Sequence, residues 1–88
     1  MRDETLEQYS ERVLDIVSAN VKKYREQRKY TQMQLDLKIG LSGSAYLGRA
    51  ELHKPNHHFN IKHLAKIAKV LDIPIICFFE PIETTNMS

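Results

Sequence analysis

The stretch from Thr31 to Glu51, TQMQLDLKIGLSGSAYLGRAE, constrains the fold of this chain more than any other segment. Thr31 followed three residues later by Gln34 is the capping-box pattern of a helix start. Apolar residues four positions apart then give this helix one inner face, and Gly40 suits the left-handed conformation that ends a helix. The segment therefore predicts a short helix, a tight turn and a second short helix that ends near Glu51.

Two helices joined by a tight, glycine-containing turn are typical of the helix-turn-helix motif, whose second helix is short enough to enter a DNA major groove. Ser42 or Ser44 can cap this second helix. Small helical domains often contain helix pairs joined by glycine, so the motif alone is a weak signal. The rest of the chain has to support it.

Length and composition are those of an ordinary soluble domain. With 88 residues, 42% of them apolar and 27% charged, the chain can build one modest core. The longest apolar runs are far shorter than the roughly 20 residues that cross a bilayer. The first twelve residues are acidic and amphipathic, unlike a secretory signal, and a single cysteine fits a reducing compartment. We expect a cytoplasmic protein.

The charges are strongly segregated along the chain. Residues 1–20 contain two basic and five acidic residues, residues 21–69 contain eleven basic and three acidic, and residues 70–88 contain three acidic and none basic. The net charges are therefore −3, +8 and −3, which sum to +2. A basic middle with acidic ends is consistent with a surface that faces phosphates, and equally with lysines that keep helices soluble.

Residues 4–28 carry apolar side chains at spacings of three and four, which predicts one long helix. The run Ser18–Asn20 could introduce a bend, with Asn20 capping a second segment. The first half has an apolar stripe to bury and an acidic outer face. It can fold back on its own domain or pair with another subunit.

The second half of the chain predicts two more helices. Asn60 is a good cap for a helix over 61–71, and Pro74 can open a last short helix that Pro81 ends. The inner face of the 61–71 helix is expected to carry Ile61, Leu64, Ile67, Ala68 and Leu71. The prediction is an all-α chain of five helices, with an N-terminal helical extension (1–20), a helix-turn-helix domain (21–81) and a flexible tail (82–88).

The TQ pair at 31–32, Gly40, the short helix ending in Glu51 and the run LAKIAKVLDIPIICFFE resemble the Cro/repressor-type helix-turn-helix family. The ending LDIPIICFFE is similar to that of the controller proteins of restriction–modification systems. The resemblance covers about residues 16–81. It implies a lambda-repressor-like, five-helix domain with an extended N-terminal helix. It also implies a transcriptional regulator, bacterial or phage, that binds a near-palindromic double-stranded DNA operator as a homodimer.

Residue roles follow from the same resemblance. Those matching base-contacting positions are Ser44, Ala45, Tyr46 and Arg49. Those expected to contact phosphate are Gln32, Ser42, Lys54 and Asn60. Arg25 and Glu51 match an ion pair that ties the first helix to the third. Physically, Arg49 is the best base reader, because a guanidinium can bond O6 and N7 of guanine together.

The chain departs from the family pattern in one important place. The turn and second helix of the motif are one residue longer than usual, which suggests an insertion near Ser42 or Gly43. An insertion inside the helix would exchange the inward and outward roles of Tyr46 and Leu47. The contact positions given above assume that the insertion lies in the turn.

Two surfaces are candidates for an interface between subunits. One is the last helix, with Phe78 and Phe79, and the other is the N-terminal helix, with Leu6, Tyr9 and Val13. The alternative function, a protein-interaction module such as an antitoxin or adaptor, would use the N-terminal helix to bind a protein partner.

Catalytic and metal chemistry are not expected. The four histidines, His53, His57, His58 and His63, have no partnering cysteine, and adjacent histidines rarely point at one ion. Cys77 lies within an apolar run and reads as a small buried hydrophobe. The sequence contains no nucleophile set and no phosphate-binding glycine loop, so it predicts neither an enzyme nor a cofactor.

Overall fold

The computed structural model describes residues 4–41, 46–51 and 59–81 of the chain. These residues form the α-helices α1 (Leu6–Gln27), α2 (Gln32–Lys38), α3 (Tyr46–Glu51) and α4 (Ile61–Leu71), and the 3-10 helix η1 (Ile75–Phe79). Within these ranges there is no strand, which confirms the all-α prediction for this part of the chain. None of the described helices is both long enough and apolar enough to cross a membrane.

The last element is a 3-10 helix and not the fifth α-helix that the sequence predicted. Pro74 precedes it with an extended backbone, and Glu80 is extended again before Pro81. Only six residues lie between the two prolines, enough for a helix of five residues, and short pieces of this kind commonly take 3-10 geometry. The described residues thus contain four α-helices and one 3-10 helix.

Helix α1 is a single, unbroken helix of 22 residues, about 33 Å long. Thr5 caps its start and forms a capping box with Gln8. The bend considered near Asn20 is absent. The Asn20 side chain is buried, and its Nδ2 donates hydrogen bonds to the carbonyl oxygens of Phe78 at 2.9 Å and Glu80 at 2.7 Å. It therefore anchors η1 and does not start a second helix.

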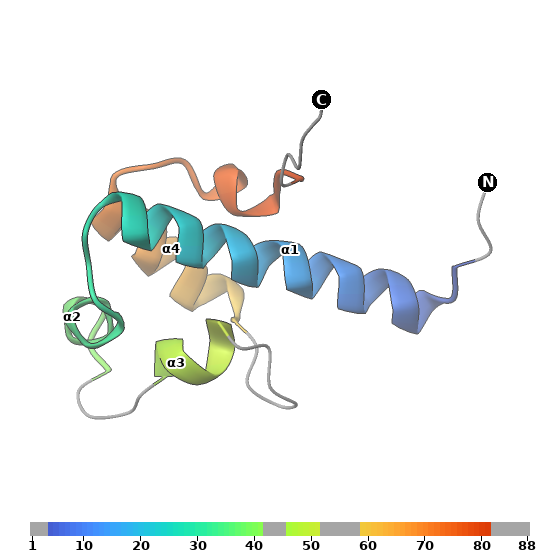
Figure 1. Ribbon diagram of the computed structural model, residues 1–88, viewed down its shortest axis with the longest axis horizontal. Coiled ribbons are helices and arrows are strands. Elements are labelled where there is room, and N and C mark those ends of the chain that lie inside the picture. The colour runs from blue at the N-terminus through green and yellow to red at the C-terminus, as the bar shows by residue number, and fades with distance from the viewer. Residues whose placement is uncertain (1–3, 42–45, 52–58, 82–88) are drawn as a thin grey trace.

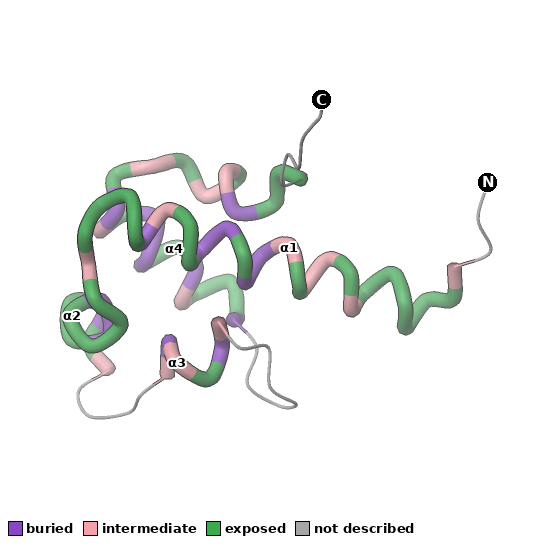
Figure 2. The backbone as a smooth tube through the Cα atoms, viewed as in Figure 1, coloured by how far each residue is buried: buried purple, intermediate pink, exposed green. Residues whose placement is uncertain are grey.

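The first half of α1, residues 6–16, extends away from the body of the molecule, and we call it the arm (Figure 1). The core begins only at Val17, after which α1 is buried on one side (Figure 2). Leu6 is 91% exposed and Tyr9 54% exposed. The arm does not fold back on its own domain. Helix α1 also runs without interruption across the domain boundary expected at residue 20.

Helix α2 and the turn after it follow the sequence prediction closely. The Thr31 hydroxyl accepts from the Gln34 amide at 3.0 Å, and the Gln34 side chain accepts from the Thr31 amide at 2.8 Å. Leu35 and Ile39 are buried, and Gly40 takes the left-handed conformation with φ of 92°. These features confirm the predicted helix and its termination.

The core is built from all five elements around the second half of α1. Helices α2 and α3 lie toward one side of α1 and η1 lies on the other (Figure 1). Phe78 is fully buried, with its ring packed edge-on against Tyr24 at 6.2 Å. Phe78 therefore has no surface to offer a second subunit, and its prediction as an interface residue was wrong. Its neighbour Phe79 is 41% exposed.

Helix α4 begins at the predicted cap. The Asn60 Oδ1 accepts from the His63 amide at 2.7 Å. Four of the five residues expected on its inner face are buried, namely Leu64, Ile67, Ala68 and Leu71. Ile61 is 67% exposed, contrary to the prediction, because it lies one turn before the buried centre of this stripe.

Candidate functional site

Helix α3 presents one face to the core and another to solvent. Leu47 and Ala50 are fully buried, whereas Arg49 is exposed and Tyr46 is half-buried. Leu47 thus takes the inward role and Arg49 the outward one. This is the register assumed when the extra residue is assigned to the turn, and it leaves the Arg49 side chain on the outer surface of the molecule.

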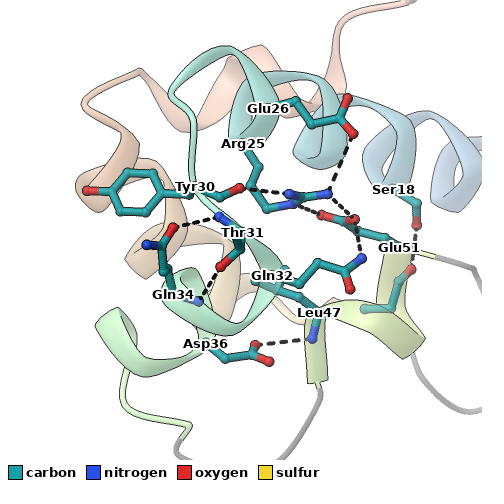
Figure 3. Close-up of polar contacts among 11 residues, drawn as sticks. Ser18, Arg25, Glu26, Tyr30, Thr31, Gln32, Gln34, Asp36, Leu47 and Glu51 are labelled. Carbon is teal, nitrogen blue, oxygen red and sulfur yellow. Dashed lines mark hydrogen bonds and ion pairs between the residues drawn. The ribbon is translucent and has the colours of Figure 1, made fainter.

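The ion pair between Arg25 and Glu51 ties α1 to the C-terminal end of α3 (Figure 3). Arg25 Nε donates to Glu51 Oε2 at 2.8 Å and Nη2 to Oε1 at 3.0 Å, while Nη1 donates to the Tyr30 carbonyl at 2.8 Å. The two side chains are only 9% and 2% exposed. Donation of hydrogen bonds to the Glu51 carboxylate is the main cause that raises the pKa of Arg25 above its usual value, so the guanidinium stays charged.

Gln32 joins the first turn of α2 to this pair. Its Nε2 donates to Glu51 Oε1 at 2.9 Å (Figure 3). Its Oε1 lies 3.3 Å from the position that a Cβ at Gly48 would occupy. The missing side chain at Gly48 therefore lets the Gln32 amide lie close against α3. The predicted phosphate-contacting residue is in this way fixed next to the proposed base-reading helix.

Two further contacts to α3 were not anticipated from the sequence. The Ser18 hydroxyl donates to the Ala50 carbonyl at 3.0 Å, and Asp36 Oδ1 accepts from the Leu47 amide at 3.1 Å (Figure 3). Ser18 and Asp36 are both buried. The available signal for Asp36 was its position three residues before Ile39, on the apolar face of the predicted helix. An acidic residue on such a face is most often paired.

The first residue of α3 packs in an aromatic cluster with residues at the start of α4. The Tyr46 ring lies 4.5 Å from that of His63 and 5.6 Å from that of Phe59. Burial raises the pKa of Tyr46 and lowers the pKa of His63, and the latter is lowered further by Lys66 and Lys62. The Nδ1 of His63 is buried without a hydrogen-bond partner among the described residues. Tyr46 is therefore in part a packing residue.

Several predicted contact residues lie outside the described part of the chain: Ser42, Ser44, Ala45 and Lys54. Asn60 is exposed, but its side-chain oxygen already caps α4. Of the predicted DNA-contacting set, the structure brings Gln32, Tyr46 and Arg49 to the α2–α3 region. Other exposed basic residues lie on α1, α2 and α4, and they include Lys22, Lys23, Lys38, Lys62, Lys66 and Lys69.

Metal-ligating geometry is absent from the described residues, which contain no group of three or more histidine, cysteine or acidic side chains suited to an ion. His53, His57 and His58 lie outside these residues.

Comparison with protein-family models, with curated proteins and with solved structures gives no match to this chain. The candidate site therefore depends on its own residues and geometry.

Proposed function

We propose that this protein is a sequence-specific double-stranded DNA-binding regulator of transcription, acting in the cytoplasm as a homodimer on a near-palindromic operator. Its domain would be a lambda-repressor-like helix-turn-helix domain in which α2 and α3 are the motif, η1 stands in for the fifth helix and α3 enters the major groove.

The observation that carries this proposal is the two-sided character of α3. Its inner residues, Leu47 and Ala50, are fully buried, and Arg49 extends from its exposed side. An arginine on a groove-sized helix can make paired hydrogen bonds to guanine, which discriminate against other bases by about 1–3 kcal/mol. The ion pair below the helix is buried, so the helix would keep a fixed orientation when it meets a duplex.

Phosphate contacts would come from the surfaces on either side of α3. Gln32 lies at the first turn of α2 beside Glu51, and Lys54 follows α3 in the chain. Basic residues outnumber acidic ones by eleven to three between residues 21 and 69. Such an excess favours association with a polyanion and makes the affinity fall as salt rises.

The proposed homodimer would place two copies of α3 in successive major grooves, about 34 Å apart. Two exposed apolar surfaces remain candidates for its interface. One is the arm, with Leu6, Tyr9 and the half-buried Val13, and the other is η1, with Phe79. Burial of the apolar side chains of either surface in a dimer interface would be favourable, because it removes them from water.

Sedimentation of single variants distinguishes these two surfaces. Leu6→Glu places an acidic residue in the first turn of α1, where the helix dipole favours it, so the fold should be unaffected. We expect at least a tenfold rise in the dimer dissociation constant for Leu6→Glu or for Phe79→Glu, whichever lies in the interface. A protein that stays monomeric at all concentrations, or a dimer that tolerates both changes, would contradict the homodimer proposed on these surfaces.

A protein-interaction module is the second candidate, and the exposed stripe of the arm favours it. Binding to labelled random duplexes over a range of salt concentrations separates the two functions. We expect measurable affinity at low salt and a steep decrease as salt rises. Absence of binding at low salt would reject the DNA-binding function and leave the interaction module as the better reading.

A further inference from the structure

Helix α3 is too short to keep its position without outside contacts. It has six residues, including Gly48, and isolated helices of that length do not form in water. At its C-terminal end it is tied by Ser18, which donates to the Ala50 carbonyl, and by the Arg25–Glu51 ion pair. The position of its N-terminal end must be set by a separate contact.

That contact comes from α2. Asp36 is only 4% exposed, and its Oδ1 accepts from the Leu47 amide at 3.1 Å. Leu47 is itself fully buried, so its amide has little access to water. A carboxylate at the first amides of a helix acts as a cap and complements the positive end of the helix dipole. Here the cap belongs to the preceding helix and thereby couples the two.

Among the described residues, the groups that shift the pKa of Asp36 most belong to α3. Burial raises the pKa of Asp36, while the backbone amides of Leu47 and Tyr46 lower it. The Arg49 guanidinium also lowers it, and the Glu51 carboxylate raises it. The Asp36 carboxylate is therefore close enough to interact electrostatically with Arg49, the side chain that we propose contacts bases.

We propose that Asp36 is the positioning residue for α3, fixing the start of the helix and thereby the place that Arg49 reaches in the groove. The effect on base recognition rests on the proposed function, whereas the effect on the position of α3 does not. Asp36 does not need to touch the duplex. It would determine which base Arg49 meets, because a shift of the helix start rotates or displaces every outward side chain.

The test compares Asp36→Asn, which keeps a side-chain oxygen to accept from Leu47, with Asp36→Leu, which has a similar size and no acceptor. The first measurement is by NMR in the absence of DNA. The Leu47 amide resonance of the wild type should move with pH with the same midpoint as the Asp36 carboxyl carbon, and the Leu47 resonance of Asp36→Asn should lose this transition. A Leu47 amide that does not follow the Asp36 carboxyl would overturn the proposal.

The second measurement is the ratio of affinities for the selected operator and for random duplex. We expect Asp36→Asn to keep this ratio and Asp36→Leu to lower it at least tenfold while random-duplex affinity changes little. An unchanged ratio for Asp36→Leu would overturn the proposal. If the wild type binds no duplex at all, the proposed function fails, and the NMR measurement alone decides whether Asp36 positions α3. If Asp36→Leu does not fold, the NMR comparison of the wild type with Asp36→Asn again decides the question.

Discussion

The arm and α3 are opposites in how they are stabilised. The arm belongs to a helix of 22 residues with a capping box at its start, and that helix is long enough to form with local support. Its apolar stripe is nevertheless largely uncovered within the described residues, with Leu6 the most exposed. Helix α3 has six residues, yet its apolar side is completely buried and side chains from α1 and α2 bond to both of its ends.

This difference separates two kinds of surface. The outward face of α3 lies on a rigidly supported helix, as a base-reading surface requires, since misplacement of the helix would shift every contact. The start of the arm exposes the apolar side chains of Leu6 and Tyr9, as a surface that meets another chain would do, whereas Val13 packs against the core. Substitutions in the two regions should therefore differ in their effect on the free energy of unfolding.

The largest expected effect comes from Glu51→Ala. It removes the closest charged partner of the buried Arg25 guanidinium and leaves only the Tyr30 carbonyl and the Glu26 carboxylate, 3.8 Å away, which should lower the free energy of unfolding by about 3–5 kcal/mol. The matched control on the arm is Arg12→Ala, which removes the exposed Arg12–Glu4 pair and should leave stability unchanged within error. Urea denaturation at neutral pH measures both. Equal losses for the two variants would contradict the contrast.

A pair of leucine truncations comes next. Leu47→Ala removes a fully buried side chain from α3 and should cost about 2–5 kcal/mol of unfolding free energy. Leu6→Ala removes an almost fully exposed one and should change the same quantity by less than about 0.5 kcal/mol. Thermal or urea unfolding at low protein concentration, where self-association does not contribute, provides the values. A large loss for Leu6→Ala would mean that the arm packs on its own domain.

Lys29 offers a smaller effect, in the turn that leads from α1 to α2. It has φ of 64°, a left-handed conformation that costs an ordinary residue about 1–2 kcal/mol. Lys29→Gly relieves this strain but makes the unfolded chain more flexible, so we expect a net gain of at most about 1 kcal/mol. Destabilisation measured by urea unfolding would show that the lysine side chain has a structural role.

The smallest effect concerns His63 beside Tyr46. Because burial lowers the pKa of His63 in the folded protein, the unfolded chain binds the proton more tightly. The contribution of neutral His63 to the free energy of unfolding is therefore fully present above the ordinary histidine pKa of about 6.5 and is lost as pH falls below it. Urea titrations between pH 5 and 8 should show this decline in the wild type and a shallower one in His63→Gln. Identical slopes would exclude His63 as its source.

Local sequence signals predicted the ends of the helices well. The capping pair Thr31 and Gln34, the cap Asn60 and the left-handed Gly40 each depend on residues a few positions apart, and all three features are present. The apolar periodicity likewise predicted one helix over residues 4–28. It could not decide whether the arm folds back, because that depends on contacts outside the helix.

Contacts between residues far apart in the sequence could not be predicted from these local signals. Asn20 was considered as a helix cap, but it bonds to carbonyls 58 and 60 residues away. Asp36 was not singled out, because its partner is a backbone amide of another helix. In the run from Ile75 to Phe79 every residue is apolar, so periodicity could not assign Phe78 to the core and Phe79 to the surface. Within the 3-10 helix the two adjacent side chains point in different directions, so Phe78 is buried and Phe79 is exposed.

The central claim is that the outward face of α3 reads bases, and selection from random duplexes by the wild type and by Arg49→Ala tests it most directly. We predict that the wild type enriches a near-palindrome with half-sites about one helical turn apart. Arg49→Ala should lose the preference for guanine at one position in each half-site, and Arg12→Ala should select the wild-type sequence. No enriched sequence for the wild type, or the same enriched sequence for Arg49→Ala, would contradict the account.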